Sequence, residues 1–162
     1  MGLTAYAAAW FLPFVLPLCL YVVFTDVSRM KITNRANLAL AGVFIVIGLI
    51  ALPFDVYLWR LLSLVVVLIV GIILNAAGVM GAGDSKFIAA AAPYIAIGDL
   101  RFLMLLFATT LLASFVVHRT AKYSPLRQLA PNWASWDQGK KFPMGLALGS
   151  TLAIYLVLGL LY

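Results

Sequence analysis

The sequence predicts an all-α protein, a polytopic integral membrane bundle of six transmembrane helices that forms one domain over residues 1–162. Three observations predict this class. Hydrophobic residues make up 65% of the chain and charged residues only 10%, whereas soluble proteins average about 45 to 50% and about 25%. The mean hydropathy is +1.11. The apolar residues also form runs that approach or exceed the roughly 20 residues needed to cross a bilayer.

The apolar runs give the expected order of the helices. The first run ends at Thr25-Asp26 and has no clear cleavage site, so we expect a retained helix rather than a signal peptide. A polar segment with three cations follows it. The fourth run is unusually brief. The six spans are expected at 3–24, 36–52, 56–77, 87–97, 102–117 and 144–162.

Basic residues are distributed unevenly between the alternate connections. One side of the predicted bundle carries nine of the eleven lysines and arginines, and the other side carries only Arg60 and Arg101. Because basic residues favour the cytoplasmic side of a membrane, we expect both termini to be non-cytoplasmic. The net charge of +6 is expected to meet anionic lipid headgroups, and membrane lipids rather than nucleic acid are the expected partners.

Three of the five acidic residues are expected to have structural roles. Asp55 and Asp99 fall on the non-cytoplasmic side in turns, and Asp55 is a candidate N-cap of the third span. Asp137 lies among polar loop residues next to Trp136. These positions leave two acids, at 26 and 84, on the cytoplasmic side near the ends of spans.

Asp26 is unfavourable on structural grounds alone. It is expected just after the last turn of the first helix, where the negative end of the helix dipole repels an acid. A salt bridge to Arg29 or Lys31 is the structural explanation for it. The alternative is a catalytic role together with a second carboxylate.

The segment Gly81-Ala82-Gly83-Asp84-Ser85-Lys86 supplies that second acid. Its glycines give conformational freedom and allow another backbone to approach closely. Asp84 is a candidate N-cap of the fourth span, and a catalytic role is compatible with capping. Two carboxylates a few ångströms apart do not both ionise, so one can activate water as a base while the other polarises a carbonyl.

The brevity of the fourth span suggests the depth of Asp84. About 14 residues separate Asp84 from the next turn, and they rise about 21 Å against a hydrocarbon core of roughly 30 Å. We therefore expect Asp84 to lie below the membrane surface in a hydrated pocket walled by protein.

The remaining reactive side chains do not suggest a metal or a cofactor. Cys19 is the only cysteine and is expected to pack in an apolar segment, and His118 is expected to be interfacial. Lys86 is either an interfacial anchor or an aid to the neighbouring acid. The connection 119–141 is either a tether on the inner leaflet or a lid.

Three separated motifs resemble the type IV prepilin peptidase family of aspartyl membrane proteases. The first is Asp26 followed by Ile32-Thr33-Asn34, with Thr33 where the family often has proline. The second is the segment 81–86, which is similar to the family's Gly-x-Gly-Asp-x-Lys. The third is Phe142-Pro143-Met144-Gly145 at the start of the last helix.

This resemblance implies that Asp26 and Asp84 are the catalytic residues. It implies a prepilin substrate, cut on the cytoplasmic side of the bacterial inner membrane between a short basic leader and a hydrophobic helix. No cofactor is expected. The supporting motif residues that it implies are Gly81, Gly83, Lys86, Asn34, Pro143 and Gly145.

The resemblance also suggests a subtype. Larger members of the family methylate the new N-terminus and carry an additional N-terminal region with paired Cys-x-x-Cys motifs, whereas this chain has one cysteine. It resembles the short, peptidase-only form associated with Flp-type (tight-adherence) pili. Presenilin-like and signal-peptide-peptidase-like enzymes share Gly-x-Gly-Asp but are longer.

The alternative from another class is a small transporter or ion-conducting bundle that uses intramembrane aspartates. Such proteins often show internal repeats and place an acid near the midplane. No repeat is visible here, and both candidate acids are expected toward one face.

Overall fold

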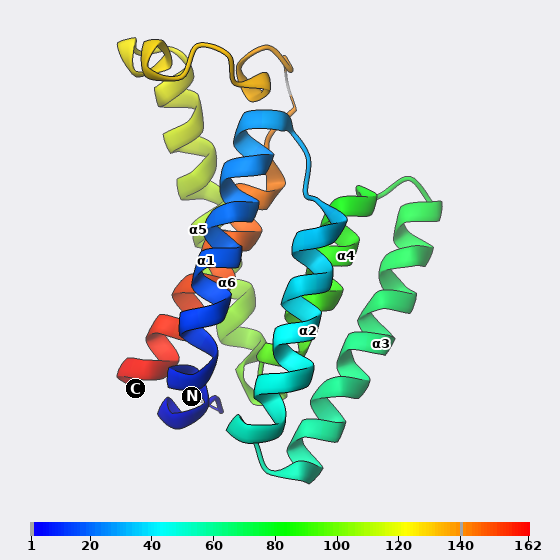
Figure 1. Ribbon diagram of the computed structural model, residues 1–162. Coiled ribbons are helices and arrows are strands. Elements are labelled where there is room, and N and C mark those ends of the chain that lie inside the picture. The colour runs from blue at the N-terminus through cyan, green and yellow to red at the C-terminus, as the bar shows by residue number, and fades with distance from the viewer. Residues whose placement is uncertain (1, 140) are drawn as a thin grey trace.

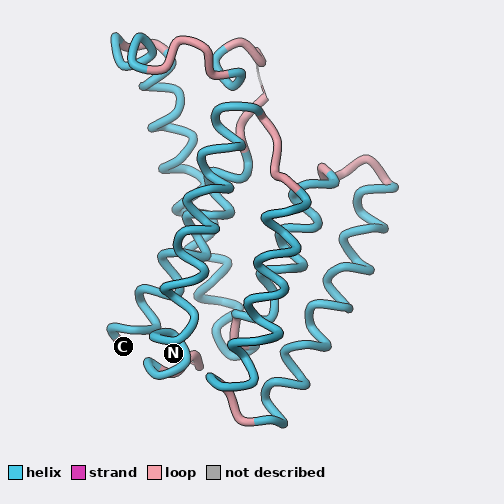
Figure 2. The backbone as a smooth tube through the Cα atoms, in the orientation of Figure 1, coloured by secondary structure: helices cyan, strands magenta, loops and turns pink. Residues whose placement is uncertain are grey.

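The computed structural model describes residues 2–139 and 141–162, and this part of the chain forms a bundle of six α-helices without strands (Figures 1 and 2). Two 3₁₀ helices follow α4, and two more lie between α5 and α6. The α-helices are α1 (Ala5–Arg29), α2 (Asn34–Ala51), α3 (Phe54–Ala76), α4 (Ala82–Ala91), α5 (Leu100–Lys122) and α6 (Met144–Leu161), and the 3₁₀ helices are η1 (Ala92–Tyr94), η2 (Ile97–Asp99), η3 (Pro125–Leu129) and η4 (Ala134–Trp136).

Five helices are long and apolar enough to cross a membrane, namely α1, α2, α3, α6 and the helix formed by η2 with α5. The predicted class, a helical membrane bundle, is therefore confirmed. The fourth expected span, at 87–97, is not among these five helices, because it consists of the ten-residue α4 continued by the short η1. Pro93 accounts for the early end of α4, because proline has no N–H to continue the helix.

The end of α1 differs from the prediction. The helix does not stop at Asp26 but continues to Arg29 and ends at Met30, whose backbone is left-handed with φ 52°. Asp26 therefore lies inside the last turn. Arg29 lies in the same turn, where a cation offsets the negative end of the helix dipole.

The start of α3 also corrects a prediction. The N-cap is Pro53 and not Asp55, and no side chain caps this helix end. Asp55 instead lies in the first turn of α3 and is exposed. An acid there interacts favourably with the positive end of the helix dipole.

The helices pack as two groups, one around α6 and one around α4, and α4 and α6 contact each other. The first helix packs against α2 and α6, and α5 packs against α6, while α3 packs mainly against α4 (Figure 1). An aromatic cluster fills the centre, where Phe11 and Tyr57 both stack on Phe44 and Tyr94 meets Phe11 edge-on. Burial of these rings packs α1, α2, α3 and η1 against one another.

Asp99 joins the two ends of the chain. Its carboxylate accepts hydrogen bonds from the backbone N–H groups of Gly2 and Leu3 and from the Tyr155 hydroxyl, at 2.8 to 3.3 Å. Asp99 precedes α5, but its side chain makes no capping bond to that helix. Its role is structural as predicted, although through these long-range bonds rather than through a cap.

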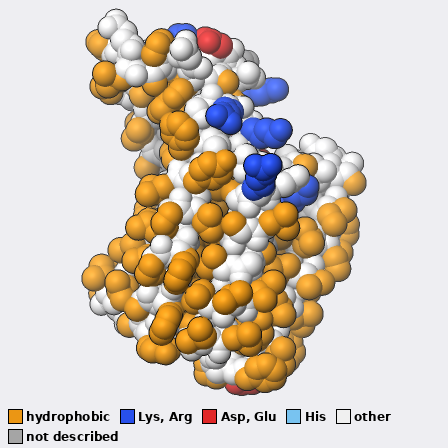
Figure 3. All heavy atoms as spheres, viewed as in Figure 1, with side chains coloured by type: hydrophobic (Ala, Val, Ile, Leu, Met, Phe, Trp, Pro, Cys, Tyr) orange, Lys and Arg blue, Asp and Glu red, His pale blue; other side chains and the backbone are white. Residues whose placement is uncertain are grey.

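The two termini lie at one end of the bundle, and the connections between α1 and α2 and between α5 and α6 lie at the other (Figure 1). Lys and Arg side chains gather toward this second end, above a face that is largely hydrophobic (Figure 3). This charge distribution agrees with the expected orientation in the membrane, which remains a prediction.

Candidate active site

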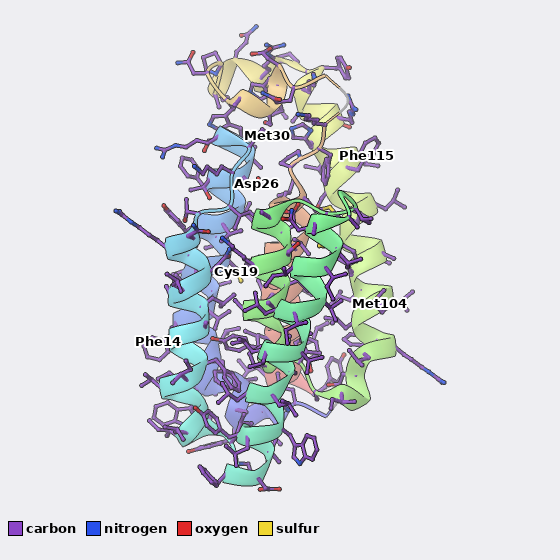
Figure 4. The ribbon with its side chains drawn as sticks, turned by 90° about the vertical axis from the view of Figure 1, so that its right-hand side faces the viewer. Phe14, Cys19, Asp26, Met30, Met104 and Phe115 are labelled. Carbon is purple, nitrogen blue, oxygen red and sulfur yellow. The ribbon has the colours of Figure 1, made fainter. Side chains whose placement is uncertain are left out.

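Asp26 is held by the first turn of α6. Its carboxyl Oδ2 accepts a 2.6 Å hydrogen bond from the backbone N–H of Gly145, and only 6% of the residue is exposed. Figure 4 shows Asp26 near the end of α1. A salt bridge to Arg29 or Lys31 is not formed, because the one ion pair among the described residues joins Arg127 and Asp137.

Gly145 allows this contact because it has no side chain. A Cβ atom at position 145 would lie 2.9 Å from both Cβ and Oδ2 of Asp26, which is closer than real Cβ atoms approach other atoms. Pro143 precedes it as the N-cap of α6, where its missing N–H is harmless. The motif at the start of α6 therefore contacts the motif that contains Asp26 directly, through Gly145.

Asp84 lies in the first turn of α4 and is partly buried. The N-cap of this helix is Gly81, and no side chain makes a capping bond, so the expectation that Asp84 caps α4 is wrong. The Asp84 carboxylate folds back over Gly81, since Oδ2 lies 2.8 Å from where a Cβ at position 81 would be. Its negative charge still benefits from the helix N-terminus.

The Gly81–Lys86 segment is fixed against the segment that follows α1. Lys86 Nζ donates a 3.1 Å hydrogen bond to Asn34 Oδ1, and Asn37 Nδ2 donates a 3.5 Å bond to the Gly83 carbonyl. A Cβ at Gly83 would lie 3.3 Å from Cβ of Ile32, so the two backbones approach closely here. The segment 81–86 therefore packs on residues 32–37, which include the end of the first motif.

These contacts bring the supporting residues of all three motifs to one end of the bundle. Asp26 and Asp84 lie at this same end, Asp26 in the last turn of α1 and Asp84 in the first turn of α4. Asp99, by contrast, lies at the opposite end and contacts Gly2. Ile32 belongs to the first motif, whereas the sequence did not indicate Asn37 as a neighbour of the site, although Asn37 follows Asn34 of that motif by three residues.

The connection between α5 and α6 packs on the end of α1. Trp133 meets Phe24 edge-on, and Trp136 stacks on His118 with ring centroids 5.1 Å apart. His118 is 5% exposed and is therefore buried under this connection rather than interfacial. Neither of its ring nitrogens has a hydrogen-bond partner among the described residues.

Two cavities flank α4. An apolar cavity of about 430 Å³ lies between α3, α4, α5 and α6, and a second one of about 370 Å³ lies between α2, α3 and α4. Asn34, Asn37 and Lys86 line the second cavity. Neither Asp26 nor Asp84 lines either cavity, so the hydrated pocket around Asp84 stays a prediction.

No group of three or more metal-ligating side chains occurs within residues 2–139 and 141–162. The candidate site consists of carboxylates, backbone amides and one lysine. Carboxylates of this kind perform acid–base chemistry.

The fold and the site define a multi-pass helical membrane protein with two acids toward one end of its bundle. The model of the type IV leader peptidase family matches residues 13–118, which include both acids. The chain belongs to this family and is therefore a peptidase of the membrane rather than the transporter considered as the alternative. Searches of curated proteins and of solved structures gave no match.

Proposed function

We propose that this protein is an aspartic endopeptidase that removes the short basic leader from Flp-type prepilins at the cytoplasmic face of the bacterial inner membrane. The observation that carries the proposal is the contact between the motifs that hold Asp26 and Asp84. One acid lies in the last turn of α1 and the other in the first turn of α4, and the motifs around them contact each other. Family membership supports leader removal as the reaction.

The pair would work as one ionised and one protonated carboxyl group. The ionised carboxylate takes a proton from water, and the resulting hydroxide attacks the scissile carbonyl, whose oxygen the protonated carboxyl polarises. Collapse of the tetrahedral intermediate breaks the C–N bond, and the amine leaves with a proton from the pair. No oxidant, reductant or cofactor is needed for this sequence.

The environment of Asp26 suits this role. Burial removes water from its carboxylate, while the Gly145 N–H fixes the position of Oδ2. A hydrogen bond from a backbone donor positions a carboxylate and stabilises its ionised form. Gly145 is therefore proposed to orient Asp26 and to leave its second oxygen for the substrate or water.

The Gly81–Lys86 segment would orient the other acid. The bond between Lys86 and Asn34 and the close packing of Gly83 on Ile32 fix the first turn of α4 against the chain that follows Asp26. A site held by backbone packing and by a hydrogen bond between side chains keeps the geometry that acid–base catalysis requires. These contacts support Gly81, Gly83, Lys86 and Asn34 as positioning residues.

The test is leader removal from a Flp-type prepilin co-expressed with this protein. Asp26→Asn and Asp84→Asn are each expected to abolish the shift from precursor to mature pilin on a gel. The matched control is Asp55→Asn, because Asp55 is exposed at the far end of the bundle. Asp99→Asn is a less suitable control, since Asp99 holds the N-terminal backbone. Full processing by either active-site variant would overturn the pair mechanism.

A second measurement tests the peptidase-only assignment. Mass spectrometry of the mature pilin is expected to show an unmodified N-terminal amine when this protein is the one processing enzyme present. A methylated amine would contradict the assignment to the peptidase-only form and leave the cleavage mechanism unaffected.

A further inference from the structure

We propose that the apolar cavity between α3, α4, α5 and α6 is the docking groove for the hydrophobic helix of the substrate. This inference rests on the proposed function, because it concerns the segment that follows the cleavage site of a prepilin. The hydrophobic helix of the substrate would lie in this groove, in contact with α3, α4, α5 and α6.

The walls of the groove fit an apolar occupant. None of its lining residues is charged, and Ser63 and Thr151 are the only lining residues with polar side chains. The Ser63 hydroxyl donates to the Arg60 carbonyl, and the Thr151 hydroxyl bonds to the Ala147 carbonyl and to Thr110. Both are therefore satisfied within the protein, and the groove offers no polar partner to a headgroup or an ion.

The groove is aligned with Asp84 along α4. Phe87, Ile88 and Ala91 line it, and they follow Asp84 by three, four and seven residues. Residues at these spacings share one face of an α-helix. The groove therefore begins about one helical turn from Asp84, on the same face of α4.

The groove is aligned in the same way with Asp26 along α6. Leu148 and Leu152 line it, and they follow Gly145 by three and seven residues. Gly145 is the residue that binds the Asp26 carboxylate. Both acids thus lie beyond the same end of the groove, where the end of a docked helix would be presented to them.

The fourth wall leaves the groove open to the membrane. Leu103, Met104 and Phe107 of α5 line it, and Met104 is 63% exposed, so the groove is not closed on this side. A helix that diffuses in the bilayer can therefore enter beside α5 without crossing the protein. Such a path suits a substrate that is itself anchored in the membrane.

The two acids beyond one end of the groove distinguish a substrate helix from a lipid as the occupant. The groove has an uncharged length that fits an apolar helix, and the bond to be cut in a prepilin lies at the end of its apolar helix, where Asp26 and Asp84 lie. A lipid acyl chain would fit the uncharged length but would make no use of the acids. We therefore assign the substrate helix as the occupant, and lipid alone becomes an outcome of the test.

Disulfide cross-linking tests this assignment directly. Met104 and Leu105 are adjacent on α5 and almost equally exposed, at 63% and 65%, but only Met104 lines the groove. With Asp84→Asn to preserve the precursor, Met104→Cys is expected to cross-link to a prepilin with a cysteine in its hydrophobic helix, and Leu105→Cys is not. The parent chain, whose Cys19 is buried, gives the background.

Cross-linking from both positions at equal yield, or from neither, would mean that lipid alone fills the groove and would overturn the proposal. That result would leave the catalytic pair untouched, because cleavage is measured separately with the active enzyme.

A kinetic comparison of two half-buried alanines gives an independent test. Ala92 lines the groove, whereas Ala41 lines the second cavity. Ala92→Trp is expected to raise KM for full-length prepilin about tenfold, the effect of losing part of an apolar contact. It should leave cleavage of a leader peptide without the hydrophobic helix unchanged, and Ala41→Trp should leave both substrates unchanged.

If Ala41→Trp rather than Ala92→Trp raises KM, the substrate docks in the second cavity and the assignment is wrong. Failure of the unsubstituted enzyme to cut either substrate would instead count against the proposed function, so the two failures are distinguishable.

Discussion

Gly145 and Asp26 are 119 residues apart in the sequence, yet the Gly145 backbone N–H donates a 2.6 Å hydrogen bond to the Asp26 carboxylate. This bond joins the first turn of α6 to the last turn of α1. It also explains why a glycine stands there, since any Cβ at position 145 would collide with Asp26. The position of one candidate catalytic acid therefore depends on close contact between the backbone of α6 and the side chain of Asp26.

Gly145→Ala is expected to lower kcat/KM for prepilin cleavage by about 100-fold, because a displacement of about 1 Å in a catalytic group can cost that much. The added methyl group would lie 2.9 Å from both Cβ and Oδ2 of Asp26, so the carboxylate has to shift. Cleavage rates of purified enzyme in detergent would measure the effect.

The matched control is Gly42→Ala, because a Cβ at that position in α2 would meet no atom within 4 Å. Cleavage by this variant should equal that of the unsubstituted enzyme, and α2 should gain up to about 1 kcal/mol from the better helix propensity of alanine. Equal activity of the two alanine variants would show that the Gly145 contact does not position Asp26.

Gly81→Ala separates the position of Asp84 from the stability of α4. The new methyl group would lie 2.8 Å from Oδ2 of Asp84, at the free end of that side chain, so the carboxylate can rotate away at little cost to folding. Cleavage is expected to fall about tenfold, while the thermal unfolding midpoint stays the same. Gly98→Ala, where a Cβ would meet nothing within 4 Å, should change neither quantity.

The sequence was sufficient to predict the class of the fold and to single out two candidate acids. A spanning helix needs a long apolar run, and these runs are visible without knowledge of the tertiary structure. Asp26 and Asp84 were visible because acids are rare in such a chain. The helix ends were predicted less well, since the polar residues from Asp26 to Arg29 continue α1 although no apolar pattern includes them.

Long-range contacts could not be read from local patterns. The Gly145 bond to Asp26 depends on how α1 packs against α6, and the Asp99 bonds to Gly2 and Leu3 join residues 96 and 97 positions apart. The sequence around Asp99 predicted only a turn, because a local sequence pattern does not indicate which distant residues a side chain will contact. Tertiary packing determines which distant amide each carboxylate meets.

Tyr155→Phe is expected to destabilise the protein by about 1 to 3 kcal/mol, because it removes a hydroxyl from a buried network. That hydroxyl donates to Asp99 Oδ2 at 2.8 Å and accepts from the Ala96 N–H at 3.1 Å. The thermal unfolding midpoint in detergent would measure the loss. The variant should still cut prepilin at low temperature, since the network lies at the end of the bundle away from the candidate pair.

Tyr6→Phe is a suitable comparison, because Tyr6 is exposed on α1. An equal unfolding midpoint for Tyr155→Phe and Tyr6→Phe would contradict the stabilising role of the Asp99 network.

Trp136→Ala is expected to loosen the connection between α5 and α6. Trp136 is buried, stacks on both His118 and Trp133, and donates its indole N–H to the Ala130 carbonyl at 2.8 Å. Replacing a buried tryptophan by alanine costs about 3 to 5 kcal/mol. Because few other contacts hold this connection, most of that loss should appear as local opening rather than global unfolding.

Limited trypsin digestion would detect the opening. Cleavage after Arg127, whose ion pair with Asp137 is exposed, is expected to become faster in Trp136→Ala. Trp59→Ala removes a tryptophan that is 67% exposed on α3 and should leave the digestion rate unchanged. If both variants are digested at the same rate, the Trp136 stack does not hold the connection against α5, and access to the end of α1 is governed by other contacts.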